Sequence, residues 1–235
     1  HVTDIDDYVW RFCTNYIRLN MITRPAEYPI PRCDDAVMFG FGQALFFILL
    51  DAFSGYHQVR LSQASAIKTA FYAPHGRKFI WVVMPFGLRN CPVVFVAMMH
   101  DFKDLWMAEC EKAGVAPSHD EGTTIIIYDT LLYGVSEDNA FIIARCVCLI
   151  ARKYHLTWKL QKCQWFPESI EFVGVDINKG GGNSPAKSKH VTIRNWPLPK
   201  TPRDILSFVS FAIFYLKWIP WFELKVQPLR AIISA

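Results

Sequence analysis

Short apolar runs alternate with longer segments of helical periodicity along the chain. The run LFFILL, which ends on Asp51, has the length and composition of a buried strand. Residues 123–134, TTIIIYDTLLYG, predict two more apolar strands, with an acid at the turn between them. The segment between these strands predicts an amphipathic helix, because apolar residues recur there at helical spacing: Phe95, Met98, Met99, Phe102 and Leu105.

The remaining segments predict further helices and strands. Residues 68–83 predict a β-hairpin around the turn APHG, and residues 34–43 a helix-like piece. A second helix is expected to begin at Ser136 and to end in basic residues. Short strands are expected within residues 157–184, whereas the C-terminal fifty residues look all-helical. This order predicts an α+β fold.

Composition excludes a disordered chain. Of the 235 residues, 52% are hydrophobic and 20% are charged, so the chain can bury a sizeable core. The net charge is only +4, but it is unevenly distributed. Residues 152–203 carry ten Lys or Arg against three Asp or Glu, and residues 101–138 carry nine acids against two lysines. This asymmetry fits a face that meets a polyanion, and it also fits two ordinary solvated faces.

The cysteine pattern and the hydropathy of the chain indicate its cellular compartment. The seven cysteines form no CxxC pair, which favours reduced intracellular thiols. The longest apolar stretch, near the C-terminus, is interrupted by Lys217 and Pro220, and the N-terminal segment does not resemble a signal peptide. We expect a soluble intracellular protein without a membrane partner, in the cytoplasm or the nucleus.

Two carboxylates stand at the ends of strongly apolar strands, Asp51 after FFILL and Asp129 after IIIY. A charged acid in such a place needs a cation, a metal or water. Two strands that deliver one carboxylate each to the same sheet edge can hold magnesium, which prefers a few hard oxygen ligands. Alternatively, both acids are separate turn or capping residues, which are common at strand ends. Spacing alone leaves both interpretations open.

Eight sequence motifs, taken together, resemble the reverse transcriptase region of gypsy-type LTR retrotransposons. They occur in the same order and at about the same spacing as in that family: LDAFSGYHQVRL, KTAF, VMPFGLRNCPVVF, YDTLLYG, LQKCQW, IEFVGVDI, WPLPKT and FYLKWIPWF. The resemblance covers residues 10–232. Several independent motifs in one order are far more specific than any single motif.

This resemblance implies a right-hand polymerase fold, reverse-transcriptase-like, with fingers and palm in residues 1–182 and a helical thumb in residues 183–235. It implies no RNase H or integrase domain in this chain. The implied activity is that of an RNA-directed DNA polymerase, a nucleotidyltransferase that uses Mg²⁺ or Mn²⁺. The implied partners are an RNA or DNA primer-template and deoxynucleoside triphosphates.

The family motifs also imply roles for individual residues. Asp51 matches the first metal-binding carboxylate, and Asp129 matches the first acid of the YxDD turn. The nucleotide-binding positions fall on Arg11, Tyr56, Phe86, Gly87 and Lys159. The primer grip falls on Phe172, Val173 and Gly174. Ordinary structural roles remain open for three of these residues, because Phe86 and Phe172 also suit a core and Lys159 also suits a solvated surface.

The chain departs from the family pattern at several chemical positions. Thr130 occupies the catalytic position of the second YxDD acid, Asn15 replaces an acid and Val96 replaces a glutamine. The N-terminal segment TDIDDYV is acidic where the family is usually basic. We therefore expect impaired catalysis, because the loss of an acid weakens the field that collects metal ions. The alternatives are a domesticated, inactive subunit of a larger complex and a fragment that retains only nucleic-acid affinity.

Overall fold

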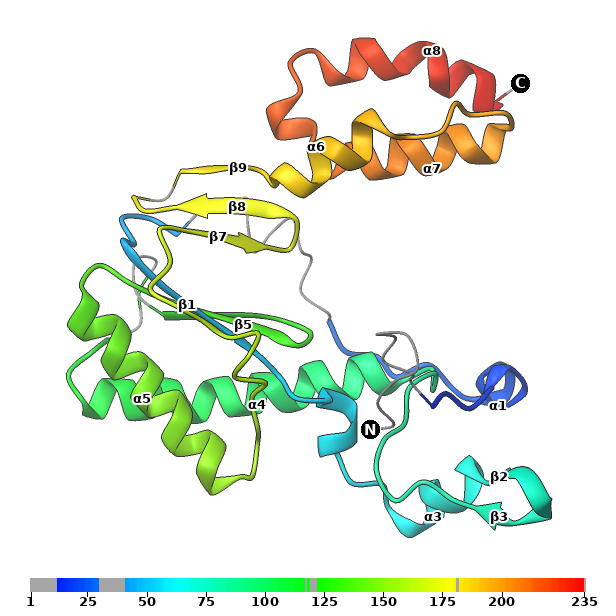
Figure 1. The fold of residues 1–235 in the computed structure, drawn as a ribbon, viewed down its shortest axis with the longest axis vertical. Helices are drawn as coiled ribbons and strands as arrows, with labels where there is room; N and C mark the ends of the chain where they lie inside the picture. The colour runs from blue at the N-terminus through cyan, green and yellow to red at the C-terminus, as the bar shows by residue number, and fades with distance from the viewer. Residues whose placement is uncertain (1–11, 30–40, 117, 119–121, 181, 235) are drawn as a thin grey trace.

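A computed structural model describes residues 12–29, 41–116, 118, 122–180 and 182–234. These residues form a layered body with a helical unit attached at its C-terminal end (Figure 1). The α+β class expected from the sequence is confirmed.

A four-stranded antiparallel sheet forms the middle layer of the body. Its strands follow the order β4-β5-β1-β6. The strands span Phe46–Asp51 (β1), Gly122–Ile126 (β4), Asp129–Gly134 (β5) and Gln164–Trp165 (β6). The three apolar strands predicted from LFFILL and from residues 123–134 are confirmed. Ile127 and Tyr128 connect β4 to β5 in a tight turn.

Two helices cover one face of this sheet, α4 (Cys91–Lys112) and α5 (Glu137–Lys153) (Figure 1). Helix α4 was predicted from its apolar periodicity, and α5 from its start at Ser136 and its basic end. The start of α5 is as expected, because the Ser136 side chain accepts a hydrogen bond from the Asn139 N–H. Their buried side chains meet Ile48, Leu50 and Leu132 of the sheet in one core cluster.

A second, three-stranded sheet packs on the opposite face. Its strands, in spatial order, are β7 (Ser169–Phe172), β8 (Val175–Asn178) and β9 (Asn183–Pro185). A second core cluster lies between the two sheets and includes Leu49, Leu131 and Phe172. The short strands predicted in residues 157–184 are confirmed. Strand β9 falls at the end of that segment and pairs with the otherwise open edge of β8.

The chain between β1 and α4 forms an extension at one end of the body (Figure 1). Its short elements are η1 (Gly55–Gln58), α3 (Gln63–Ala66), η2 (Ile67–Thr69), β2 (Phe71–Tyr72), η3 (Pro74–Gly76) and β3 (Lys78–Phe79). The predicted hairpin around APHG is confirmed by the pairing of β2 with β3. Helix α1 (Ile17–Ile22) packs beside this extension. The helix-like piece expected at residues 34–43 lies mostly outside the described residues.

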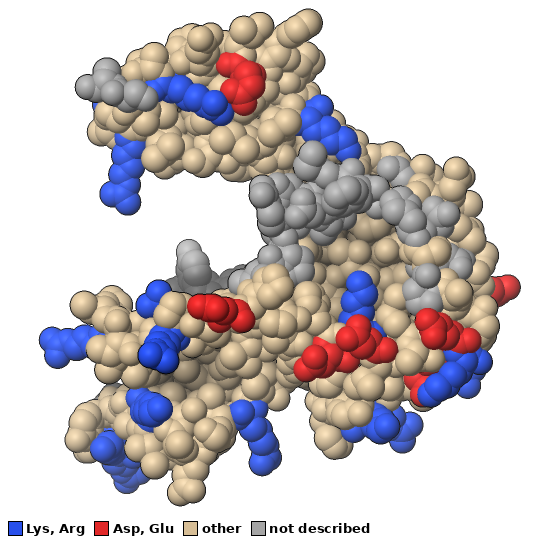
Figure 2. Space-filling view, turned by 180° about the vertical axis from the view of Figure 1, so that it is seen from behind, with Lys and Arg blue, Asp and Glu red and all other residues tan. Residues whose placement is uncertain are grey.

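The C-terminal unit contains α6 (Lys187–Arg194), α7 (Pro202–Ile213), η4 (Leu216–Trp218) and α8 (Phe222–Ser234). Helix α7 begins as expected at Thr201, which forms a capping box with Asp204. Several hydrogen bonds attach the unit to the three-stranded sheet, among them those from Tyr215 Oη to the Gly174 carbonyl and from Trp218 Nε1 to the Asn183 carbonyl. Between this unit and the body the surface is deeply hollowed (Figure 2). No helix among the described residues is long and apolar enough to cross a membrane.

Candidate active site

Asp51 and Asp129 are direct partners across the antiparallel ladder between β1 and β5. Directly opposite residues share a face of the sheet. Two positions further along each strand, Leu49 and Leu131 pack between the two sheets. Because side chains alternate along a strand, the two aspartates project from this same face, which the three-stranded sheet partly covers. We call Asp51 and Asp129 the carboxylate pair. The expected juxtaposition of these two acids at one sheet edge is therefore observed.

The carboxylate pair lies in an environment that disfavours two negative charges. Burial, and then the charge of Asp51, raise the pKa of the Asp129 carboxyl above its ordinary value, while Lys162 acts against this rise. The Lys162 Nζ lies 3.3 Å from Asp51 Oδ2, and the Asp51 side chain is only 20% exposed. A further positive charge would stabilise this arrangement of two close acids and Lys162, because it would reduce the repulsion between the carboxylates.

Lys162 was missed at the sequence level, although the signal was present in the motif LQKCQW. The resemblance implied a different role, nucleotide binding, for Lys159. In the structure the backbone N–H of Lys159 donates to the Asp51 carbonyl over 2.8 Å. Among the described residues, the cation within ion-pair distance of the carboxylate pair is Lys162.

Gln58 holds the segment that carries Lys162 against β1. Its Nε2 donates to the carbonyls of Phe53 and Thr157, over 2.7 and 3.0 Å, and its Oε1 accepts from the Thr157 N–H over 2.8 Å. The Phe53 N–H also donates to the Thr157 carbonyl. The bonds between Gln58 and Thr157 join residues 99 positions apart in sequence, so the tertiary fold brings Lys162 to Asp51.

Thr130 does not join the carboxylate pair. Its strand partners are Leu50 and Ile125, both buried on the side of α4 and α5. The Thr130 side chain is 0% exposed, and its Oγ1 has no hydrogen-bond partner. Strand alternation therefore directs Thr130 away from the face that carries Asp129.

An aromatic cluster lies beside the turn that precedes Asp129. The Tyr56 ring is 8% exposed and packs against Tyr128, Phe95 and Phe86, with ring centroids 5.0, 5.8 and 5.4 Å away. Gly55 is required by this packing, because an added Cβ would lie 2.6 Å from Tyr128 Cδ1 and 2.8 Å from Phe95 Cζ. The structure thus brings Tyr56 and Phe86 together, and Tyr56 also packs on Tyr128, the residue before Asp129.

Gly87 lies next to Phe86 in a left-handed conformation, with φ of 90°. Its carbonyl accepts a hydrogen bond of 2.7 Å from Asn20 Nδ2, which ties this loop to α1. Arg11, the remaining nucleotide-binding position implied by the resemblance, lies outside the described residues.

Of the three expected primer-grip residues, Phe172 ends β7, and Val173 and Gly174 form the turn to β8. Val173 and Gly174 both have positive φ, 52° and 80°, as in a tight two-residue hairpin. Phe172 is 1% exposed and lies in the core between the sheets, as its structural alternative proposed. The Gly174 carbonyl accepts from the Ala186 N–H and from Tyr215 Oη, so the turn anchors the helical unit.

A cavity of about 400 Å³ lies apart from the carboxylate pair, between α1, α3 and the start of α4. Its lining includes three basic residues, Arg60, Lys68 and Arg89. Neither Asp51 nor Asp129 lines it.

The model of the reverse transcriptase (RNA-dependent DNA polymerase) family matches residues 8–177. The chain belongs to the reverse transcriptase family. Curated relatives of this reverse transcriptase domain include Pol polyproteins of Drosophila melanogaster transposons. The chain is 26% identical to that of transposon 297 over 225 residues and 28% identical to that of transposon gypsy over 227 residues. It spans 96% and 95% of its own length in these matches, but only 20% of each polyprotein.

Solved structures of a foamy viral protease-reverse transcriptase share the fold of this reverse transcriptase domain. One, in complex with double-stranded DNA, superimposes with a TM-score of 0.82 at 19% identity and covers 99% of this chain and 38% of its own. Another, in complex with an RNA/DNA hybrid, has a TM-score of 0.74 at 18% identity and covers 94% and 28%. The right-hand polymerase fold implied by the motifs is therefore confirmed.

Reverse transcriptase domains generally use divalent metal ions. Within the described residues, the chain has no group of three or more His, Cys, Asp or Glu side chains able to hold a metal. The carboxylate pair does fit a divalent cation, because it offers hard oxygen ligands from two adjacent strands and carries unfavourable like-charge repulsion.

Proposed function

We propose that this chain is the polymerase part of a retroelement reverse transcriptase that adds deoxynucleotides to a primer on an RNA or DNA template at a strongly reduced rate. The observation that carries the proposal is the register of Asp51 opposite Asp129, on the sheet face that Thr130 does not share. The chain covers one fifth of its curated relatives, so the activity of a whole polyprotein is not assigned to it.

The carboxylate pair would hold Mg²⁺, with Mn²⁺ as the alternative. A bound divalent cation supplies Lewis-acid activation of an attacking hydroxyl and stabilisation of a leaving pyrophosphate. Asp51 and Asp129 offer it two carboxylates, and water and substrate phosphates complete the oxygen ligands that magnesium prefers. Lys162 neutralises part of the charge of the pair in the absence of the ion.

The proposed domain assignment follows the polymerase pattern. The extension from η1 to β3, together with α1, is assigned to the fingers, and the four-stranded sheet with α4 and α5 to the palm. The helical unit from Lys187 is assigned to the thumb. The hollow between this unit and the body is the proposed path of the primer-template (Figure 2). Residues 152–203, with ten basic and three acidic side chains, contribute to this path and favour a polyanion there.

The proposed nucleotide pocket lies beside the carboxylate pair. Tyr56 and Phe86 form its packed aromatic wall, and the Gly87 loop forms its rim. Phe172, Val173 and Gly174 are proposed as the primer grip, with Phe172 holding the turn to the core and the Gly174 backbone holding it to the helical unit. Lys159 is proposed to position Asp51 through its backbone N–H, and Lys162 is proposed to supply the positive side chain next to the carboxylate pair.

Impaired catalysis is proposed because the third acid is missing. Thr130 is neutral, so the metal site keeps the charge of two carboxylates, and Lys162 cancels part of it. Electrostatic stabilisation is commonly the largest contribution to such reactions. We expect a rate lower by orders of magnitude than that of a site with all three acids.

Primer extension tests the proposal. A labelled primer on homopolymer RNA and DNA templates is incubated with deoxynucleotides and Mg²⁺ or Mn²⁺. We expect slow incorporation by the native chain and none by Asp51→Asn, with Asp101→Asn on α4 as the matched control that keeps activity. Incorporation by the native chain that does not exceed that of Asp51→Asn under either metal would contradict the proposal.

The second candidate is a catalytically inactive subunit that binds nucleic acid or protein within a larger assembly. The ion pair between Lys162 and Asp51 favours it, because a lysine can replace a metal as the permanent counter-charge. This function requires the absence of incorporation, and its nucleic-acid-binding form also requires duplex binding with steep salt dependence. Incorporation by the native chain would exclude it.

A further inference from the structure

The cavity of about 400 Å³ between α1, α3 and the start of α4 is separate from the proposed polymerase site. Neither acid of the carboxylate pair lines it, and neither do Tyr56, Phe86 or Gly87 of the proposed nucleotide pocket. Its volume is within the range of pockets that bind small organic ligands, which starts at roughly 300 Å³. We call it the α1–α4 cavity and consider which ligand its lining fits.

The floor of the α1–α4 cavity is aliphatic. Met84 and Cys91 are 3% and 2% exposed, and Leu19 and Val59 line the cavity beside them. Cys91 Sγ donates to the Pro85 carbonyl over 3.2 Å, and burial raises the pKa of its thiol to about 12, so the thiol is neutral. None of the described residues that line the cavity is aromatic. The floor therefore suits an aliphatic chain rather than a flat ring.

Positive side chains stand at the mouth of the cavity. Arg60, Lys68 and Arg89 line it and are exposed to solvent. No Asp or Glu is among the described lining residues, and residues 52–100 contain no acid at all. Within the described part of the chain, these three cations form no ion pair. Because charges of one sign surround an apolar floor, the mouth attracts an anion.

Arg89 is held in place at this mouth by the end of α1. Its Nη1 donates to the carbonyls of Asn20 and Thr23, over 3.3 and 3.4 Å, and its backbone N–H donates to Asn20 Oδ1 over 2.8 Å. Both side-chain bonds use the same terminal nitrogen, so among the described residues Nε and Nη2 remain available for a ligand. A guanidinium group fixed in this way matches the two oxygens of a carboxylate.

We propose that the α1–α4 cavity binds a small aliphatic carboxylate, with its apolar chain on the floor and its carboxylate at the mouth, against Arg89. A nucleobase would gain little in this cavity, because bases bind by stacking on aromatic rings, which the described lining lacks. Inorganic phosphate would meet the cations but would leave the apolar floor in contact with water. This binding goes beyond the proposed polymerase function, because no step at the carboxylate pair requires it.

The test is isothermal titration calorimetry of the full chain with octanoate, 1-octanol and inorganic phosphate. We expect octanoate to bind at one site and more tightly than the other two probes, because octanol lacks the charge and phosphate lacks the aliphatic chain. Octanol or phosphate binding as tightly as octanoate would overturn the proposal.

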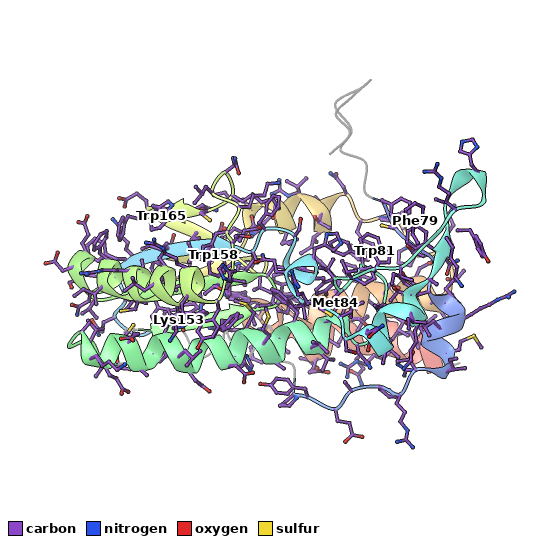
Figure 3. The ribbon with its side chains drawn as sticks, turned by 90° about the horizontal axis from the view of Figure 1, so that it is seen from below. Phe79, Trp81, Met84, Lys153, Trp158 and Trp165 are labelled. Atoms are coloured by element: carbon purple, nitrogen blue, oxygen red, sulfur yellow. The ribbon has the colours of Figure 1, made fainter. Side chains whose placement is uncertain are left out.

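A charge variant tests the mouth of the cavity. Lys68→Gln should weaken octanoate binding by about threefold, because it removes one exposed cation from the mouth. The matched control is Lys153→Gln, which removes an exposed cation from the end of α5 and should leave binding unchanged. Met84 on the cavity floor lies nearer the hairpin end of the molecule, whereas Lys153 lies toward the other end (Figure 3). Equal affinities of the two variants would contradict the assignment of the anion to this mouth.

A bulky side chain tests the cavity itself. Val94 lines the cavity from α4 and is 40% exposed, so Val94→Trp can fill the cavity without entering the core. This variant should lose saturable octanoate binding, whereas Val191→Trp, which changes a 58% exposed valine of α6, should bind like the native chain. Thermal melting verifies folding, and Lys68→Gln decides if Val94→Trp does not fold. Unchanged octanoate binding by folded Val94→Trp would overturn the proposal. Displacement of octanoate by a blunt DNA duplex would overturn it too, because it would assign the cavity to the primer-template path.

Discussion

Asp129 stands directly opposite Asp51 in the β1–β5 ladder, and the two carboxylates share one face of the sheet. This relationship places two like charges at the turn where the chain also buries an aromatic cluster. Most of the site's expected behaviour follows from this repulsion and from the ammonium group of Lys162, which offsets it.

The first prediction concerns pH. Burial and the charge of Asp51 raise the pKa of the Asp129 carboxyl. The stabilisation of the folded state by protonated Asp129 is therefore fully present below the ordinary carboxyl pKa and is lost as pH rises through the raised pKa. At neutral pH and without divalent cations, Asp129→Asn should therefore melt at a higher temperature than the native chain. The difference should vanish at low pH, where the native carboxyl is protonated. Asp101→Asn is the control, and a lower melting temperature for Asp129→Asn at neutral pH would refute the argument.

The second prediction concerns metal binding. Added Mg²⁺ or Mn²⁺ should stabilise the native chain, by about 2.7 kcal/mol at a concentration one hundred times Kd. Asp51→Asn should abolish this effect because it removes half of the carboxylate pair. Lys162→Gln should raise metal affinity, since its ammonium group competes for Asp51. Differential scanning calorimetry across a metal titration measures both effects, and equal stabilisation of all three proteins would place the ion elsewhere.

The third prediction concerns Thr130. Thr130→Val keeps the shape and removes a buried hydroxyl without a partner, so stability should stay equal or rise by about 1 kcal/mol. Thr130→Asp restores the acid of the family pattern, but on a buried face, and should cost about 3 kcal/mol or more. Urea unfolding measures both values. A Thr130→Asp variant as stable as the native chain would show that this side chain reaches water or a cation.

The fourth prediction concerns Gly55. Gly55→Ala forces a Cβ into the rings of Tyr128 and Phe95 and should destabilise the fold by about 1–3 kcal/mol. Gly182→Ala is the matched control, because an added Cβ there has nothing within 4 Å, and its effect should stay within about 0.5 kcal/mol. Equal unfolding free energies for the two variants would mean that the Tyr128 ring moves aside without cost.

Local signals determined the elements of this chain. The apolar run before Asp51, the cap at Ser136 and the capping box at Thr201 each act within one or two turns of backbone, so residue patterns alone predicted β1, α5 and α7. The ordered motifs also implied the polymerase fold and the two acids. The sequence predicted short strands in residues 157–184 but not which of them pair: Asn183–Pro185 has little strand character of its own, and the open edge of β8 provides its partner.

Only the tertiary structure decided which side chains meet. Lys162 rather than Lys159 faces Asp51, because Gln58 fixes the backbone of a segment 99 residues away. The Thr130 side chain lies on the opposite face of the sheet from the carboxylate pair, because side chains alternate along β5 and a packed layer covers each face. The ring contact of Phe12 with Phe71 likewise joins residues that are far apart in sequence. Such contacts join distant parts of the chain, and their energies are absent from any local window of sequence.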